Sequence, residues 1–235
     1  MNDKEWVEPR PKNGYEPRLG MNQDRGGLRM STSANRWLVG SDQSENPEFS
    51  TPLARQREPR HGATMPQAGV PVPGAADRLP RREAVWPATI WWLGVHGGAG
   101  ESTLAAFTPG TRPCDHAWPI PTTPGTTHRV VLVARTNYAG LIAAQRAATE
   151  WASNVLGEGV QLAGLVLIAD APGRRPKELR HLEQVIVGGV PRVWNLPWVD
   201  AWRLGPPDAT APLPKEFRSL FTDLALAPSS VPAHN

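Results

Sequence analysis

Residues 96–103 read HGGAGEST, a glycine-rich turn that leads into a serine and a threonine. Glycines let a backbone fold tightly around an anion, and the N–H groups at the start of a helix attract negative charge. An apolar run ends directly before the turn, and a helix-compatible stretch follows it. This order is typical of a loop that binds the phosphates of a nucleotide. The residues that would hold the nucleotide are Gly97, Gly98, Ala99, Gly100, Glu101, Ser102 and Thr103.

The charge of this turn is opposite to the one that phosphate binding needs. Glu101 stands where such loops carry a lysine, and Val95 replaces the first glycine of the general pattern. A carboxylate about 4 Å from a phosphate oxygen costs on the order of 4 kcal/mol at an effective dielectric of about 20. Phosphoryl transfer also depends on a cation that neutralises developing charge. The sequence therefore predicts that tight binding and hydrolysis of ATP are disfavoured.

Polar residues that follow later apolar runs could complete or replace such a site. Arg135, Arg174 and Arg175 leave strand ends at the same edge, so one of them could turn into the vacant lysine position. The same arginines could instead pair with Glu101 and close an empty site. Asp170 is of the type that holds a metal ion at a strand end.

Two residues of the turn have both a functional and a structural interpretation. Ser102 is the hydroxyl expected to hold Mg²⁺ in such loops, and the same hydroxyl would serve as a helix cap. His96 could donate to a phosphate when protonated, but a histidine beside a glycine turn is more often a structural hydrogen-bond partner. Cys114 is the only cysteine, which excludes a disulfide framework and a cysteine-based zinc site.

Four short apolar runs must position these residues, at 89–95, 129–134, 163–169 and 191–197. The middle two are almost continuously apolar and β-branched, as is typical of parallel strands buried on both faces. Ligands of such sheets bind at the carboxyl ends of the strands, where the glycine turn, Arg135 and Asp170 follow.

Helical segments alternate with the apolar runs. Residues 138–157 carry an apolar stripe, with Asn137 as a plausible N-cap and with Arg146 and Glu150 on the opposite, polar face. Two further helices are predicted at 176–188 and 214–226, each opening on a proline. This alternation predicts a three-layer α/β domain with a mostly parallel sheet.

The turn resembles the variant phosphate loop of the ParA/MinD-like (SIMIBI-class) partitioning ATPases. Their pattern Lys-Gly-Gly-x-Gly-Lys-Thr-Thr corresponds to residues 96–103, where His96 and Glu101 replace both lysines. The segments RVVLVARTNYAGLIAAQRA and GLVLIADAPGRRPKEL look like late strand–helix units of that family, so that the likeness spans about residues 88–203. It implies a P-loop NTPase-like fold with a degenerate loop. By order in the chain, the resemblance also places Asp170 at the family's base-reading position instead of a metal site. The Arg, Ala, Pro and Trp bias also resembles a little-characterised actinobacterial family of such proteins.

The chain departs from this family between the turn and the second long apolar run. Roughly thirty residues, most of them in a proline-rich stretch, occupy the place of the family's switch segments and Asp-x-x-Pro-Gly-type metal motif. Asp115 could stand for the acidic residue that follows the family's second strand, but no clear strand precedes it. The helix after the turn can hardly pass Phe107, because Pro109 and Gly110 end it.

Composition divides the 235 residues into three parts. Residues 1–84 are rich in Pro, Gly, Arg, Gln, Asn and Ser and are predicted to be a disordered arm, 85–226 the folded domain, and 227–235 a flexible tail. The formal net charge is +3 without a clustered basic face, so no nucleic-acid surface is indicated. No run is long and apolar enough for a membrane segment, and we expect a cytoplasmic protein.

Two functions from different classes agree with these features. The favoured hypothesis is a pseudo-ATPase, not an enzyme, that acts as an adaptor or assembly module. Its protein partner would bind through the N-terminal arm, with its apolar island at 35–40, or through a loop socket in which Glu101 accepts a cation. The resemblance suggests DNA partitioning, conjugation or secretion as settings, and it is compatible with a homodimer.

The alternative is a nucleotide-binding protein or slow ATPase that uses arginine in place of the lysine. It would require ATP and Mg²⁺, whereas the favoured hypothesis requires no cofactor. A third interpretation is that the glycine turn occurs by coincidence in an unrelated α/β protein.

Overall fold

The apolar runs of the sequence form one parallel sheet. The computed structural model describes residues 62–205, 207–208 and 211–227. The sheet order is β3-β2-β5-β6-β7, and all of its pairings are parallel. The expected α/β architecture with a mostly parallel sheet is thus confirmed. Its strands are β2 (Trp91–Gly94), β3 (Arg112–Pro113), β5 (His128–Arg135), β6 (Val160–Ile168) and β7 (Val193–Leu196).

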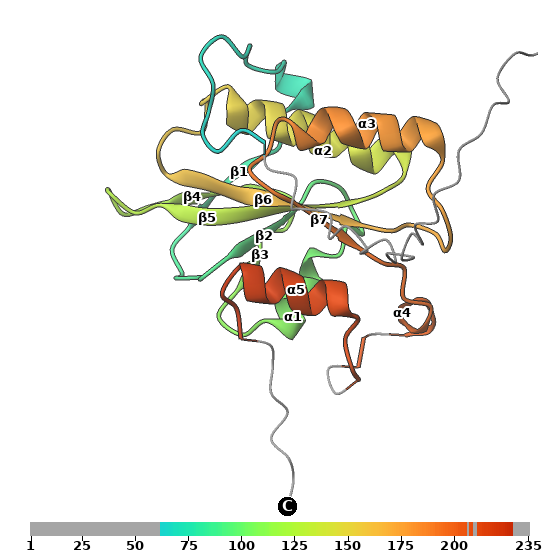
Figure 1. Ribbon diagram of the computed structural model, residues 1–235. Helices are drawn as coiled ribbons and strands as arrows, with labels where there is room; N and C mark the ends of the chain where they lie inside the picture. The colour runs from blue at the N-terminus through green and yellow to red at the C-terminus, as the bar shows by residue number, and fades with distance from the viewer. Residues whose placement is uncertain (1–61, 206, 209–210, 228–235) are drawn as a thin grey trace, which may run out of the picture. The chain divides into compact units, whose positions relative to one another are not determined.

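Helices cover both faces of the sheet. Figure 1 shows α2 and α3 on one face and α1 and α5 on the other, which is a three-layer arrangement. Within the described part of the chain, no helix has the length and apolar character needed to cross a membrane. The helices are α1 (Glu101–Phe107), α2 (Tyr138–Ala152), α3 (Lys177–Val187), α4 (Ala201–Leu204) and α5 (Lys215–Asp223).

The helix boundaries agree with most of the sequence signals. The Asn137 side chain accepts a hydrogen bond from the Gly140 N–H at 2.8 Å, so the predicted N-cap of α2 is confirmed. α1 ends at Phe107, as expected from the following proline and glycine. α2 stops at Ala152, earlier than predicted, because the chain turns through Asn154, whose φ is 60°.

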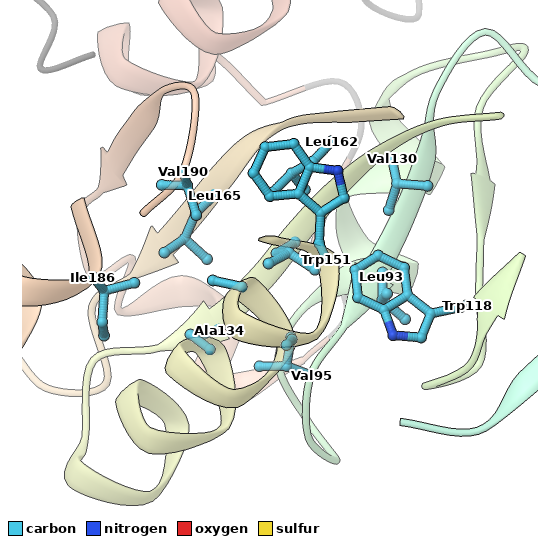
Figure 2. Packing of buried hydrophobic residues seen from close by; sticks show 14 of the residues in the cluster. Leu93, Val95, Trp118, Val130, Ala134, Trp151, Leu162, Leu165, Ile186 and Val190 are labelled. Atoms are coloured by element: carbon cyan, nitrogen blue, oxygen red, sulfur yellow. The ribbon is translucent and has the colours of Figure 1, made fainter. Parts of the chain in front are cut away.

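The sheet is buried on both sides, which explains its continuously apolar strands. Along β5, Val130 and Leu132 face one apolar cluster, whereas Val131 and Val133 face the other. Figure 2 shows part of the first cluster, where Trp151 of α2 gathers with leucines and valines of the strands. Alternate residues of one strand thus serve two cores.

The folded region begins earlier than the sequence predicted. Residues 62–84, assigned above to the disordered arm, lie against the domain and are called here the N-terminal strap. The strap contains a 3₁₀ turn (η1, Ala75–Asp77) and strand β1 (Arg81–Ala84), which pairs in parallel with β4 (Trp118–Pro121). Residues 1–61, including the apolar island at 35–40, and residues 228–235 of the tail lie outside the described residues.

Long-range hydrogen bonds hold the strap, and local periodicity does not reveal such bonds. The Gly62 N–H donates to the Val190 carbonyl at 3.1 Å, and the Gln67 N–H donates to the Ala152 carbonyl at 2.9 Å. A Cβ atom at Gly62 would lie 2.4 Å from the Val187 carbonyl oxygen, so this contact requires glycine. The composition of the strap is that of a linker, but its backbone is bonded to the domain.

Glu150 of α2 is the main side-chain anchor of the strap. Its Oε2 accepts from the Leu79 N–H at 3.0 Å and from Trp118 Nε1 at 2.9 Å, and Arg81 lies 3.7 Å from Oε1. Sequence analysis placed Glu150 on a polar face of α2, but the strap covers that position and the side chain is fully buried. The buried carboxylate therefore links α2, β4 and the strap.

Candidate functional site

The glycine loop, residues 95–100, lies at the point where the strand order reverses. β3 is on one side of β2, whereas β5, β6 and β7 continue on the other. The helices that follow β2 and β5 cover opposite faces of the sheet (Figure 1). The chain connections that leave β2 and β5 therefore run to opposite faces of the sheet. Open parallel sheets bind their ligands in the crevice that such a divergence leaves at the carboxyl ends of the two strands. The sequence-predicted site residues lie around this switch point.

The turn itself depends on glycine. Gly98 and Gly100 have φ angles of 72° and 108°, and a Cβ atom at Gly100 would lie 2.7 Å from Ile168 Cδ1. Ala99 is buried between them and donates its N–H to the His96 carbonyl at 3.3 Å. Gly100 occupies the N-cap position of α1. The loop is thus compact and joins β2 directly to α1.

Glu101 is turned back into the fold. Only 5% of the residue is exposed, and its Oε2 accepts from the Gly94 N–H at 2.6 Å. Its Oε1 lies 3.4 Å from His116 Nδ1, which is also 2.8 Å from the Gly94 carbonyl oxygen. Because both neighbours of Nδ1 are acceptors, this nitrogen carries the ring proton.

This geometry corrects two sequence-based expectations about Glu101. The carboxylate is bound by the backbone of β2 and by a histidine, so it does not project freely among the loop N–H groups. It is also too buried to serve as an open socket for a partner's arginine or lysine. Glu101 is instead an internal tie between α1, β2 and the segment before β4.

The histidine of this tie is positioned by an unusual backbone. Asp115 and His116 have φ angles of 49° and 59°, which non-glycine residues rarely adopt, and the surrounding structure must hold them there. Arg82 of β1 pairs with Asp115 at 3.1 Å. The two-residue strand β3 directly precedes this segment, so Asp115 follows a short strand next to β2 that the sequence did not reveal.

The only thiol of the chain lies beside this tie but is not activated. Cys114 is buried, and burial, followed by the Glu101 and Asp115 carboxylates, raises the pKa of its thiol far above the usual range. A nucleophilic cysteine needs the opposite shift, because the thiolate is the reactive form. Cys114 therefore acts as a small core residue.

His96 has the structural role that a histidine beside a glycine turn most often has. Its Nε2 accepts from the Arg135 N–H at 3.0 Å, and its Nδ1 lies 2.9 Å from the Gly97 carbonyl oxygen. The proton is therefore on Nδ1, and the ring is neutral. A Cβ atom at Gly140 would lie 2.9 Å from Nε2, so α2 packs closely on this ring. His96 thus joins the ends of β2 and β5.

Arg135 is the arginine that reaches the glycine loop. Its Nε donates to the Gly98 carbonyl at 3.2 Å and its Nη1 to the Ala169 carbonyl at 3.0 Å. Burial lowers the pKa of Arg135, and the nearby Asp170 carboxylate opposes this shift. The guanidinium therefore lies across the switch point, bonded to the loop on one side and to the end of β6 on the other.

The other two arginines have different surroundings. Arg175 pairs with Glu183 and donates to Asn195, and Arg174 is exposed. In the described part of the chain, none of the three arginines contacts Glu101, whose partner is His116. Of the two alternatives left open by the sequence, closure of the site by an arginine–Glu101 pair is therefore wrong.

Asp170 and Ser102 are not brought together as metal ligands. Asp170 Oδ1 accepts from the Thr136 hydroxyl at 2.9 Å and lines a hollow of about 180 Å³ formed by residues 169–176 and Thr136. Ser102 is exposed on α1, and Thr103 is half-buried there. Among residues 62–205, 207–208 and 211–227, no group of three His, Cys, Asp or Glu side chains is arranged to hold a metal ion.

Sequence reasoning missed the residues that fix Glu101. The position of His116 in the sequence has no spacing typical of a ligand, and Gly94 lies inside an apolar run that predicts only a strand. A Cβ atom at Gly94 would lie 3.0 Å from Glu101 Oε2 and 3.1 Å from His116 Nδ1. A glycine inside an apolar strand, directly before a glycine turn, is the one signal that could have indicated a close approach at this point.

Comparison with known proteins gives a family but not a function. The model of a family of unknown function, DUF6668, matches residues 88–220. No curated protein and no solved structure matches the chain. The matched region contains the glycine loop, Arg135 and Asp170, and it leaves out the N-terminal strap. Because the match covers more than half of the 235 residues, the chain belongs to DUF6668.

Proposed function

We propose that this protein is a catalytically degenerate relative of the ParA/MinD-like ATPases that acts as an adaptor or assembly module. The observation that carries the proposal is the position of Glu101. The residue in the place of the catalytic lysine is a carboxylate that is bonded to Gly94 and His116 inside the fold. The loop thus has no lysine for phosphate charge, and its carboxylate has a purely structural use.

The environment of Arg135 supports the same proposal. Its guanidinium donates to two backbone carbonyls, at Gly98 and Ala169. These two bonds use two of the five guanidinium N–H groups. A phosphate that required the side chain to turn toward it would break them, and a hydrogen bond to a charged group contributes about 2 kcal/mol. The Arg135 side chain is therefore held across the switch point by backbone carbonyls of its own chain, as expected of an assembly module that does not use it to bind phosphate.

One feature favours a nucleotide-binding protein as the second candidate. The N–H groups of Gly97, Gly98 and Gly100 have no hydrogen-bond acceptor in the part of the chain that the structure describes, and Arg135 lies beside them. A guanidinium matches the geometry of a phosphate. With ATP and Mg²⁺, Arg135 would then serve in place of the missing lysine.

Calorimetric titration of the full-length protein with Mg-ATP distinguishes the two candidates. We expect no saturable heat below about 1 mM, which corresponds to a binding free energy weaker than about −4 kcal/mol. Micromolar binding that is lost in Arg135→Ala and retained in Arg174→Ala would overturn the proposal and support the second candidate. Arg174 is a suitable control because it is a neighbouring, exposed arginine.

A further inference from the structure

A second hollow lies away from the glycine loop, between the N-terminal strap and the edge of the sheet. It has a volume of about 360 Å³, and no residue of the glycine loop lines it. One wall is formed by residues 82–86, which are the end of the strap and the two residues after it, and the other by residues 112–115 and 117. The first wall lies before the region matched by the family, so the strap creates this hollow.

The walls are mainly apolar and aromatic. Trp86 is 64% exposed and the neighbouring Val85 65% exposed, which places two large apolar side chains together at the surface. Trp91 and Pro113 also line the hollow. Clustered exposed apolar residues of this kind mark binding surfaces, whereas single exposed ones do not.

Some hydrogen-bond donors of the residues that line the hollow lack acceptors in the described chain. The buried indole N–H of Trp91 has no partner within the described chain. The Arg112 guanidinium lies 5.8 Å from the centre of the Trp86 ring. Its Nε donates to the Pro87 carbonyl at 3.3 Å, and its Nη groups have no acceptor among the described residues. A ligand that suits this surface is therefore rich in acceptors and presents flat apolar groups to indole rings.

Two charged side chains that line the hollow, Arg112 and Glu83, have no ion-pair partner among the described residues. The other two, Arg82 and Asp115, pair with each other. Charge complementarity therefore calls for a ligand with one acidic and one basic group. This requirement excludes a purely apolar ligand and a simple anion.

The edge strand of the sheet, β3, limits the conformation that a ligand can adopt. Strand addition to β3 is disfavoured, because this strand has two residues and one of them, Pro113, has no N–H group. A polyproline II segment needs no continuous strand edge. It has no internal hydrogen bonds, so its carbonyl groups are free to accept, and its proline rings pack on aromatic grooves.

We propose that this hollow is a docking groove for an extended, proline-rich segment of a partner protein that carries an acidic and a basic residue beside its prolines. Prolines pack on Trp86, the acidic residue pairs with Arg112 and the basic residue with Glu83. The inference goes beyond the adaptor function and does not depend on it, because a glycine loop that bound nucleotide would leave the groove unchanged.

Fluorescence anisotropy with the full-length protein tests the groove. The probe is a labelled peptide of about ten residues, mostly proline, with one glutamate and one arginine, a length typical of polyproline II ligands. We expect saturable binding that Trp86→Ala weakens at least about tenfold, as for an aromatic hot spot. Arg112→Gln should weaken binding less and reduce its salt dependence.

The controls distinguish specific binding in the groove from non-specific hydrophobic binding. Tyr138→Ala removes an aromatic residue that is similarly exposed, at 68%, but does not line the groove, and it should leave binding unchanged. A peptide with the same charges and alanine for every proline should bind at least about tenfold more weakly. Absence of binding, equal binding by Trp86→Ala, or equal binding of the alanine peptide would each overturn the proposal.

Discussion

Glu150→Ala should lower the free energy of unfolding by about 3 kcal/mol, because two donors lose their acceptor. These donors are the Leu79 N–H and the Trp118 indole N–H, and Trp118 is fully buried. The strap should also detach from α2. Denaturant unfolding measures the first effect, and hydrogen exchange of residues 62–84 measures the second.

Two variants of the same helix serve as controls. Glu150→Gln keeps one acceptor oxygen in nearly the same shape, so it should cost less than the alanine variant. Arg146→Ala removes an exposed ion pair with Asp77 at 3.0 Å, and such pairs contribute at most about 1 kcal/mol. If Glu150→Ala cost no more than Arg146→Ala, the carboxylate would not be the anchor of the strap.

Glu101→Lys should cost about 3 kcal/mol of stability, because a lysine leaves the buried Gly94 N–H without an acceptor and places a cation beside His116. The lysine ammonium is better solvated at the surface than inside the fold. We expect the side chain to leave the buried position and to turn toward the glycine loop. We therefore expect Mg-ATP to raise the melting temperature of this variant and not that of the wild type.

Glu101→Gln is the matched variant for this experiment. It retains an acceptor for Gly94 and adds no cation, so it should be more stable than Glu101→Lys and should not respond to Mg-ATP. Thermal unfolding with and without the nucleotide measures both properties. A lysine variant as stable as the wild type would show that the tie to Gly94 does not hold the loop.

The sheet could be predicted because its strands are buried on both faces. Residues 130–134 are apolar at every position, so this run alone predicts a strand that is buried on both faces, independently of the rest of the chain. The N-cap at Asn137 could also be predicted from the neighbouring residues alone. The strap was missed for the opposite reason, since Gly62 and Gln67 are held by carbonyl groups more than eighty residues away in the chain.

The candidate site was predictable in its location but not in its side-chain geometry. Strand ends bring the glycine loop and Arg135 together, and strand order follows from alternating elements. The direction of Glu101 depends on His116, which comes from a left-handed segment fifteen positions later. Glu150 was misjudged in the same way, because a helical face is polar or buried according to what covers it.

The central claim is that Glu101 and Arg135 are bonded within their own chain, and that the glycine loop does not carry a nucleotide. The most direct test is to purify the full-length protein without added nucleotide, denature it, and quantify released nucleotides by chromatography. We expect far less than one nucleotide per chain. Stoichiometric release of ATP, ADP or another nucleotide would contradict it.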